Sequence, residues 1–329
     1  MTALYVTSLA EGVGKTTICA GLAKHMLNNG QKVGFFKPII AKEVEGSGSD
    51  ALFIKQILSL DEPVENICPV ISGEDKVVSK IKKAYAQVSR DKDVVLVEGV
   101  CEQSMVETLN ARAIIVEGYS EGLSLTRLNS SYQGWEEHLL GVVINKVPRS
   151  RVETVRNEIT SHSGESGVNI LGVLPEDRIL FTISVDELAR HLQGEILNYA
   201  KKSVELVENL MLGAMTVDPG PEYFGRKTNK AVVVRGERPD MQMAALETSM
   251  RCLILSGNTA PIPAVQNRAK DKSVPIIVVK SDTASTVMAI EDALNKARFN
   301  QEKKLPRLAE IMEKHFSFQM VYQGLGLAS

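Results

Sequence analysis

The sequence predicts an α/β protein: a doubly wound parallel sheet followed by a second, smaller α/β domain. Short apolar runs rich in Val and Ile recur along the chain, as expected of parallel strands that are covered on both faces. Helical patterns separate these runs, and a length of 329 residues is enough for two domains. A glycine-containing turn between the first strand and the first helix indicates where such a sheet binds a ligand.

The first domain is expected over residues 1–197. A helix should follow its first strand, because Ile18, Leu22 and Met26 recur on one helical face and Gly30 is suited to end the helix. The strands are predicted at six apolar runs, namely Ala3–Val6, Val33–Phe36, Val94–Val97, Ala113–Val116, Gly141–Ile144 and Ile170–Leu174.

A linker over residues 198–207 is expected next, with a charged helical pattern around Asn198–Glu208. The second domain then covers residues 208–329. Its strands are predicted at Ala231–Val234, Cys252–Leu255 and Val274–Val279, and its helices at Met241–Glu247 and Thr283–Leu294. Near the C-terminus, the spacing of Leu305, Leu308, Met312 and Phe316 predicts one amphipathic helix that packs on this second domain.

The most informative segment is Val6–Thr17, which reads VTSLAEGVGKTT. Gly12, Val13 and Gly14 lie in the turn, and Lys15, Thr16 and Thr17 open the helix. Backbone amides of such a turn face an anion, and the helix N-terminus adds positive potential. The lysine supplies a cation, and the Thr16 hydroxyl is suited to hold Mg²⁺. The segment predicts a nucleoside triphosphate site, although Leu9 stands where the standard pattern has its first glycine.

Four polar residues, three after predicted strands and one before a predicted helix, are further candidates. Glu98 ends an apolar strand and is placed to hold Mg²⁺. Asp50 is either a metal ligand or part of a helix N-cap. Lys37 either neutralises charge during phosphoryl transfer or is a solvated lysine before a turn proline. Asn145 follows another strand, and its amide could recognise a base edge.

The second domain has one candidate cluster. Arg238 and Asp240 follow one predicted strand, and Gly257 follows the next. Loops at the ends of parallel strands can hold an anion or a nucleotide. The alternative is ordinary turn chemistry with a surface ion pair, which would stabilise the protein little.

The composition of the chain limits the kinds of partner and metal site that we expect. A formal net charge of −2 favours neither nucleic acid nor an anionic membrane. No apolar run approaches the roughly 20 residues that a membrane-spanning helix needs. The four cysteines are far apart, which indicates reduced thiols in a cytoplasmic protein, and the five scattered histidines argue against a histidine-based metal site.

Taken together, the motifs of residues 1–197 resemble the dethiobiotin synthetase family of P-loop proteins. The shared features are the Gly-Lys-Thr loop, Lys37-Pro38, Ser49-Asp50 and Val97-Glu98-Gly99. The resemblance implies a P-loop NTPase-type fold. It also implies Mg-ATP bound by Lys15, Thr16, Asp50 and Glu98, with Asn145 near adenine.

Nearly the whole chain resembles the N-terminal region of long-form phosphate acetyltransferases, in which a DRTGG domain follows a dethiobiotin-synthetase-like domain. The matching segments are Ile170–Asp177, Arg235–Asp240 and Ser256–Asn258. Val100–Glu102 depart from true dethiobiotin synthetases, which have small residues there. Because the sequence ends at Ser329 without an acyltransferase catalytic domain, it is not expected to be a phosphate acetyltransferase by itself.

Two functions follow as hypotheses. The first is a regulatory protein that binds Mg-ATP, has at most weak ATPase activity, and senses a small effector or binds a partner through its DRTGG domain. The alternative is an ATP-dependent ligase or carboxylase in which Lys15 and Lys37 stabilise the transferred phosphoryl group. A structural relic without a nucleotide is a third possibility. Two α/β domains also offer enough surface for a homodimer.

Overall fold

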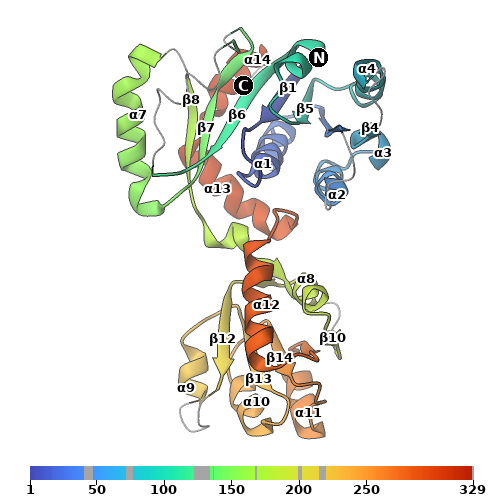
Figure 1. Cartoon of the computed structure of the whole chain (residues 1–329), viewed down its shortest axis with the longest axis vertical. Coiled ribbons are helices and arrows are strands. Elements are labelled where there is room, and N and C mark those ends of the chain that lie inside the picture. Colours follow the sequence, from blue (N-terminus) through green and yellow to red (C-terminus); the bar gives the residue numbers. More distant parts are fainter. Residues whose placement is uncertain are drawn as a thin grey trace. The chain divides into compact units, whose positions relative to one another are not determined.

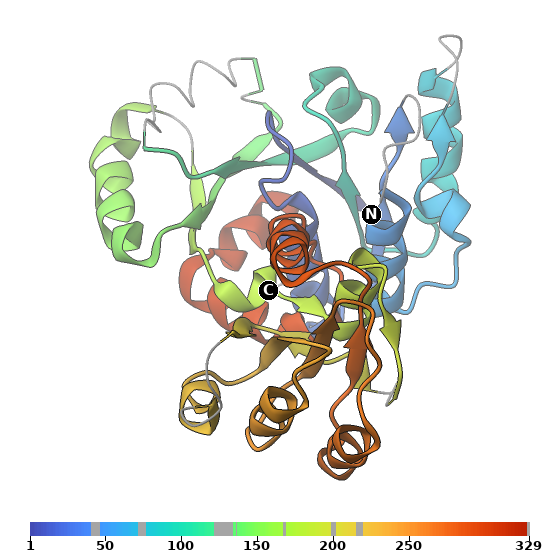
Figure 2. The ribbon, with the colours of Figure 1, turned by 60° about the horizontal axis from the view of Figure 1, so that its bottom comes forward.

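The computed structural model describes residues 1–40, 47–71, 77–121, 134–135, 137–166, 169–198, 202–214 and 220–327. The chain divides into two compact units (Figures 1 and 2). The first unit comprises Met1–Asp177 together with Phe299–Ser329, and the second comprises Arg178–Arg298.

The first unit contains a parallel sheet of six strands in the order β2-β5-β1-β6-β7-β8. All six predicted apolar runs lie within these strands, so the predicted doubly wound sheet is confirmed. The side chains of these strands are largely buried because helices cover both faces of the sheet. The apolar sequences of the runs predicted this burial. The strands are β1 Thr2–Thr7, β2 Val33–Phe36, β5 Val94–Glu98, β6 Ala111–Gly118, β7 Leu139–Val147 and β8 Ile170–Pro175.

Helices α4, α5 and α7 contribute to one apolar cluster with alternate residues of the sheet, such as Tyr5, Val97 and Ile144. The opposite side of β1 and β5 packs on α1, whose Ile18, Leu22 and Met26 are fully buried. The helices and short strands are α1 Lys15–Asn28, β3 Ile39–Ile40, α2 Ser47–Leu58, α3 Val64–Ile67, β4 Val70–Ile71, α4 Val77–Val88, α5 Gln103–Thr108, η1 Arg149–Arg151 and α7 Val152–Ser166.

The C-terminal segment also belongs to the first unit. Helix α13 (Leu305–His315) packs on α1 and β8, and Figure 1 shows it in red beside the blue α1. Phe316 forms a bridge with Gly172, and α14 (Phe318–Leu325) follows. The expectation of a single helix on the second domain is therefore wrong. Gly21 of α1 suits this contact, because a side chain there would overlap Met312 of α13.

The second unit has a sheet of five strands in the order β10-β15-β14-β13-β12, parallel except for β10. It is the predicted second α/β domain. Its elements are η2 Arg178–Phe181, β9 Ile183–Ser184, α8 Val185–His191, β10 Glu195–Ile196, β11 Leu206–Val207, β12 Asn209–Gly213, α9 Gly220–Gly225, β13 Lys230–Arg235, α10 Pro239–Leu246, β14 Cys252–Ser256, α11 Pro263–Lys272, β15 Ile276–Val278 and α12 Thr283–Asn295.

Two expectations about the connection between the units need correction. The first domain was expected to extend to residue 197, but the chain passes into the second unit after Asp177. Helix α8 belongs to the second unit, because its Val185 and Leu188 lie in the apolar core of that unit. The charged helix expected around Asn198–Glu208 is not formed in its described part, which contains β11 and is followed directly by β12. Leu206 and Val207 of β11 pair with β9, and this pairing outweighs the helical pattern. Residues 199–201 of that prediction lie outside the described residues.

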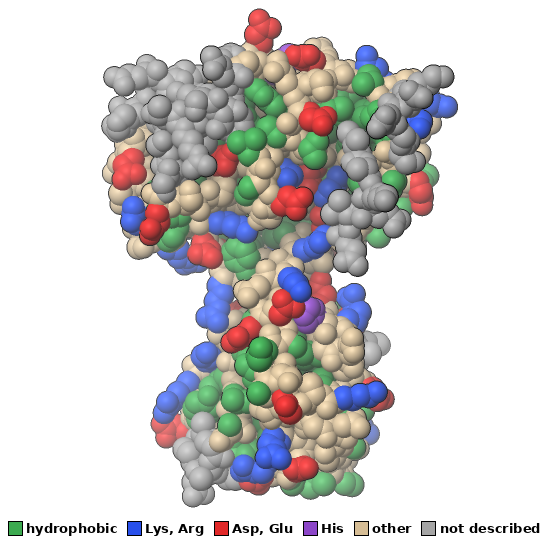
Figure 3. Space-filling view, in the orientation of Figure 1, with side chains coloured by type: hydrophobic (Ala, Val, Ile, Leu, Met, Phe, Trp, Pro, Cys, Tyr) green, Lys and Arg blue, Asp and Glu red, His purple; other side chains and the backbone are tan. Residues whose placement is uncertain are grey.

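The face of the molecule in Figure 3 carries acidic and basic side chains interspersed on each unit. This mixture agrees with the formal net charge of −2. The displayed face therefore presents no broad field of one sign.

Candidate functional site

The turn between β1 and α1 has the backbone that the glycines predicted. Gly12 and Gly14 have φ angles of 69° and 103°, in the left-handed region that favours glycine. A side chain at Gly14 would also overlap the Nδ2 atom of Asn145. The first intrahelical bond of α1 runs from the Ile18 N–H to the Gly14 carbonyl over 3.1 Å. The amides before Ile18 have no partner within the helix, so they are suited to an anion.

Two neighbouring side chains at the end of β7 hold this turn. Asn145 donates through Nδ2 to the carbonyl of Val13 at 2.8 Å, and Lys146 donates through Nζ to the carbonyl of Gly12 at 2.7 Å. With these carbonyls held toward β7, the orientation of the turn's peptides is fixed. Lys146 was missed in the sequence, where its position directly after Asn145 was the only signal.

Lys15 lies in the first turn of α1, as predicted. Its Nζ donates to the hydroxyl of Ser8 at 2.8 Å, and that hydroxyl donates to the carbonyl of Ala10 at 2.7 Å. Ser8 is buried, with 5% of its surface exposed. A hydroxyl within the loop thus holds the lysine that was predicted to bind phosphate, a role of Ser8 that the sequence pattern did not suggest.

Beside the loop, four predicted residues from separate elements lie together. Thr16 donates through its hydroxyl to Oε1 of Glu98 at 3.0 Å. The Lys37 Nζ lies 2.8 Å from the same Glu98 oxygen and 2.8 Å from Oδ2 of Asp50. The side chains of Lys37, Asp50 and Glu98 are only 15%, 12% and 5% exposed. Lys37 is therefore not a solvated lysine, and Asp50 lies in the first turn of α2 rather than at its N-cap.

The electrostatics of this group are those of a buried ion cluster. Burial by itself would lower the pKa of Lys37, but the carboxylates of Glu98 and Asp50 outweigh it, and the net effect is a raised pKa. The lysine therefore remains charged at neutral pH, which balances part of the negative charge of the two acids.

One atom of the cluster fits a bound cation. Oε2 of Glu98 is buried and has no hydrogen-bond partner, whereas Oε1 of the same carboxylate accepts from the Thr16 hydroxyl. A hard divalent cation takes such oxygen ligands and keeps several waters. The described residues contain no group of three or more His, Cys, Asp or Glu side chains suited to a metal.

A hydrogen bond from Tyr5 holds the backbone of the segment after Glu98. The hydroxyl of Tyr5 donates to the carbonyl of Val100 at 2.9 Å, and a side chain at Gly99 would overlap that hydroxyl. Val100 is 55% exposed. A bulky apolar side chain is thus exposed two residues after Glu98.

In the second unit, the three predicted residues follow β13 and β14. Arg238 pairs with Asp240 at 2.7 Å, with side chains 37% and 43% exposed. Gly257 has a φ angle of 87°, and its N–H donates to the carbonyl of Ser281. These contacts are the ion pair and the turn of the alternative interpretation, so a ligand at this place stays a prediction.

The fold and the loop define a class: a P-loop NTPase-like domain joined to a second α/β domain. The chain belongs to the AAA domain family, whose model matches residues 2–182, and a model of the DRTGG domain matches residues 187–293. The predicted combination of a dethiobiotin-synthetase-like P-loop domain with a DRTGG domain is confirmed.

The chain is also a distant homologue of the N-terminal half of phosphate acetyltransferases. It is 23% identical to that of Nitrosomonas europaea over 99% of this chain and 52% of the relative, and 22% identical to that of Escherichia coli over 93% and 50%. A probable cobyric acid synthase of Methanocaldococcus jannaschii is 24% identical over 62% of this chain and 51% of the relative. The chain spans about half the length of the curated relatives it matches.

Solved structures match less closely. The MinC:MinD cell division protein complex of Aquifex aeolicus gives a TM-score of 0.37 at 20% identity, over 55% of this chain and 83% of that chain. The CBS and DRTGG domains of the regulatory region of Clostridium perfringens pyrophosphatase, complexed with the activator diadenosine tetraphosphate, give 0.30 at 15% identity, over 57% and 78%. The fold assignment rests on the chain's own sheet order and on the family models.

Within the described ranges, we find no helix whose length and hydropathy suit a bilayer crossing.

Proposed function

We propose that this protein is a regulatory Mg-ATP-binding protein, with its first unit binding the nucleotide and its second unit sensing a small effector or binding a partner. One observation carries the nucleotide part. Thr16, Lys37 and Glu98 meet Asp50 beside a glycine turn whose amides have no helical partner. Each of these groups suits a metal–triphosphate complex, and their proximity supports one shared site for it.

The residues have distinct roles in this proposal. The amides of residues 12–17 and the ammonium of Lys15 bind the phosphates. Thr16, Asp50 and Glu98 hold Mg²⁺, which neutralises phosphate charge when it is bound. Lys37 adds a second cation for charge that develops on the transferred phosphoryl group. Asn145 lies near the adenine and supports the loop through its bond to Val13.

The regulatory role is supported by two features. Val100 and the following Cys101-Glu102 add bulk and charge where a small substrate would approach the phosphates. The second unit places Arg238, Asp240 and Gly257 at the carboxyl ends of parallel strands, where α/β sheets commonly bind ligands. The similarity to phosphate acetyltransferases suggests acetyl-CoA or acetyl phosphate as the first effectors to try.

Calorimetric titration with ATP, ADP, acetyl-CoA and acetyl phosphate, combined with a steady-state ATPase assay, tests the proposal. We expect Mg-ATP to bind, to raise Tm as any ligand of the folded state must, and to turn over slowly. Rapid ATP consumption on addition of a carboxylate or amine substrate would contradict the regulatory role.

The second candidate function is an ATP-dependent ligase or carboxylase of dethiobiotin synthetase type. The position of Lys37 between two acids of the site favours it, because a regulatory nucleotide site has less need of a second buried cation. Incubation with diaminopelargonate, CO₂ and Mg-ATP tests its most specific form. Formation of dethiobiotin would establish the ligase, and its absence with intact ATP binding would leave the regulatory protein.

Two further parts of the proposal concern the state of the protein. We infer a homodimer, which sedimentation velocity would detect. We also infer a reducing, cytoplasmic location, because no disulfide joins Cys19, Cys68, Cys101 or Cys252 in the described structure.

A further inference from the structure

Lys37 lies where the proposed metal ligands converge. Its ammonium is 2.8 Å from Asp50 and 2.8 Å from Oε1 of Glu98, the oxygen that also accepts from Thr16. All three proposed metal ligands are thus connected, directly or through Glu98, to one protein cation.

The ammonium of Lys37 offsets the repulsion between the two carboxylates of the cluster. Two carboxylates that are nearly buried repel each other strongly in a medium of low dielectric constant, and one cation between them removes most of that cost. A divalent ion would do the same with two charges. Lys37 and a metal ion therefore compete for the charge of the same two carboxylates. Oε2 of Glu98 is open to a metal, but a metal that uses both acids must replace the ammonium that lies between them.

A displaced ammonium needs a new partner, because an unpaired buried charge is costly. Terminal phosphate oxygens are suitable partners for a lysine beside a phosphate-binding turn. The nucleotide would therefore supply the anionic partner that Lys37 loses when a metal binds the two acids.

We propose that Lys37 is an internal counter-ion that keeps divalent metal off Asp50 and Glu98 until a nucleoside triphosphate accepts its ammonium. Mg²⁺ then binds only together with the triphosphate and not by itself. This inference rests on the proposed Mg-ATP site and adds the order in which its components enter.

The test is metal binding without nucleotide. Mn²⁺, detected by electron paramagnetic resonance, is titrated into the full-length protein and three variants. The wild type should bind Mn²⁺ alone at least about tenfold more weakly than Lys37→Met, in which the two acids have lost their cation. Lys37→Arg keeps the charge and should exclude Mn²⁺ as the wild type does.

Lys92→Met is the matched control. Lys92 pairs with Glu62 at 2.9 Å, and their side chains are 18% and 19% exposed, so this variant also removes a half-buried lysine partner of an acid. It should leave Mn²⁺ binding unchanged. An equal gain in Lys92→Met and Lys37→Met would show that any freed carboxylate binds the metal, and would overturn the inference.

The wild type alone gives a second test that does not depend on the folding of a variant. Millimolar Mg²⁺ without nucleotide should leave Tm unchanged, whereas Mg²⁺ with a non-hydrolysable ATP analogue should raise it. A rise with Mg²⁺ alone would overturn the counter-ion role of Lys37. Equal Mn²⁺ affinity of the wild type and Lys37→Met would do the same, and if Mg-ATP still bound, the proposed function would stand. Failure of the wild type to bind Mg-ATP would instead reject the function itself.

Discussion

At the scale of single residues, we expect Lys15 and its hydroxyl partner Ser8 to set how strongly the proposed phosphate loop binds its ligand. The Lys15 ammonium already has a bond to Ser8, so phosphate must offer more than a hydroxyl does. A charge-assisted bond to phosphate is the stronger of the two. Nucleotide binding is therefore expected to move Lys15 away from Ser8.

Lys15→Ala should weaken ATP binding by at least about 30-fold, which corresponds to about 2 kcal/mol and is the usual size of a charged hydrogen bond. Isothermal calorimetry measures this directly. Lys24→Ala, on the same helix, is the control and should bind as the parent does. If Lys15→Ala binds ATP as tightly as the parent, the assignment of the phosphate loop is wrong.

A change at Glu98 should distinguish the binding of the metal from the binding of the nucleotide. In Glu98→Gln the amide keeps the size of the side chain but loses the charge that suits Mg²⁺. We expect the Mg²⁺ concentration for half-maximal ATP binding to rise about tenfold or more, while ATP affinity at saturating Mg²⁺ changes only a few-fold. Titrations of ATP at several fixed Mg²⁺ concentrations distinguish the two. Equal loss of both would assign Glu98 to the nucleotide instead.

At the scale of elements, strand β7 acts on the loop through its last residues. Lys146→Met removes the bond to the Gly12 carbonyl but leaves that of Asn145 to Val13. We expect ATP affinity to fall about five- to tenfold, the worth of about 1 kcal/mol for one hydrogen bond, with Tm nearly unchanged. Lys146→Arg should recover most of the affinity. A fall in Tm without a fall in affinity would make Lys146 a structural residue only.

The packing of the C-terminal helices on the first unit predicts a pH dependence. His25 of α1 stacks on Phe318 with ring centroids 3.6 Å apart, and His315 at the end of α13 lies 2.9 Å from Nη2 of Arg156. Burial lowers the pKa of His25 below 6.5, against the opposite effect of Glu313. Burial, followed by the charge of Arg156, also lowers the pKa of His315.

Both histidines therefore take up protons more readily in the unfolded chain than in the folded one. Their stabilisation is complete above pH 6.5 and is lost as the pH falls toward their folded-state pKa values. Urea denaturation between pH 5 and 8 should show a free energy of unfolding that declines below about pH 6.5. The decline should be shallower in His25→Gln, and an unchanged slope would contradict the role of His25.

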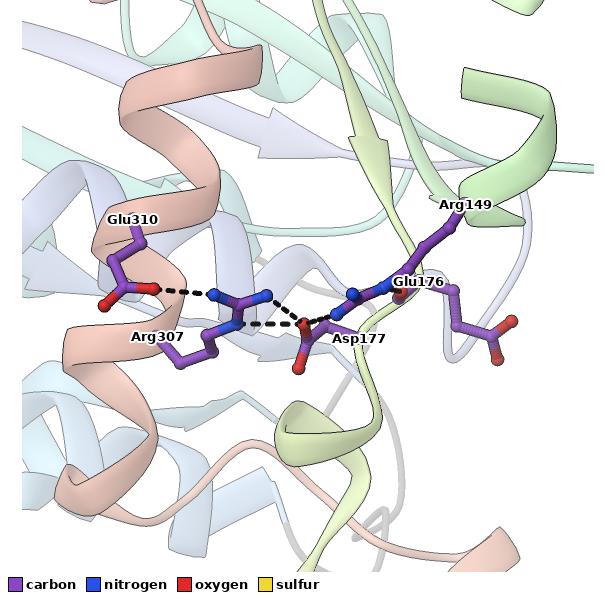
Figure 4. Close-up of polar contacts among 5 residues, drawn as sticks. All are labelled: Arg149, Glu176, Asp177, Arg307 and Glu310. Atoms are coloured by element: carbon purple, nitrogen blue, oxygen red, sulfur yellow. Dashed lines mark hydrogen bonds and ion pairs between the residues drawn. The ribbon is translucent and has the colours of Figure 1, made fainter. Parts of the chain in front are cut away.

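At the scale of the whole molecule, the chain leaves the first unit at Asp177 and re-enters it at Phe299. Figure 4 shows how the departing and the returning segments are joined within the first unit. The carboxylate of Asp177 accepts from both Arg149 and Arg307. Asp177 is 2% exposed. Arg307 also pairs with Glu310 of α13. This cluster fixes the returning segment to the end of β8.

Asp177→Asn removes the negative charge and leaves two guanidinium groups facing each other. We expect the first unit to lose about 2 kcal/mol, less than the full cost of breaking a buried pair because both arginines are partly exposed. Chemical denaturation measures the loss. Glu310→Gln, which removes only an exposed partner of Arg307, should cost less than about 1 kcal/mol. Equal losses in the two variants would show that Asp177 has no special role.

The sequence by itself determined the parallel sheet of the first unit and the phosphate loop, because these depend on local patterns. A strand buried on both faces must be apolar throughout, and a left-handed turn must have glycine at Gly12 and Gly14. Lys37, Asp50 and Glu98 were found singly, from their positions near strand and helix ends. Lys146 and Ser8 were missed, because no sequence pattern connects them to the residues that they contact.

Only the tertiary structure decided which surfaces meet. The apolar stripe of α13 predicts that the helix is buried, but it does not show which surface covers it. In the structure that surface is α1 and β8, and Gly21 of α1 leaves room for Met312 of α13. The ion cluster is the same kind of case. A sequence shows that one lysine and two acids are present, but their shared position between α1, α2, β2 and β5 arises only when the sheet is assembled, because long-range packing brings them together.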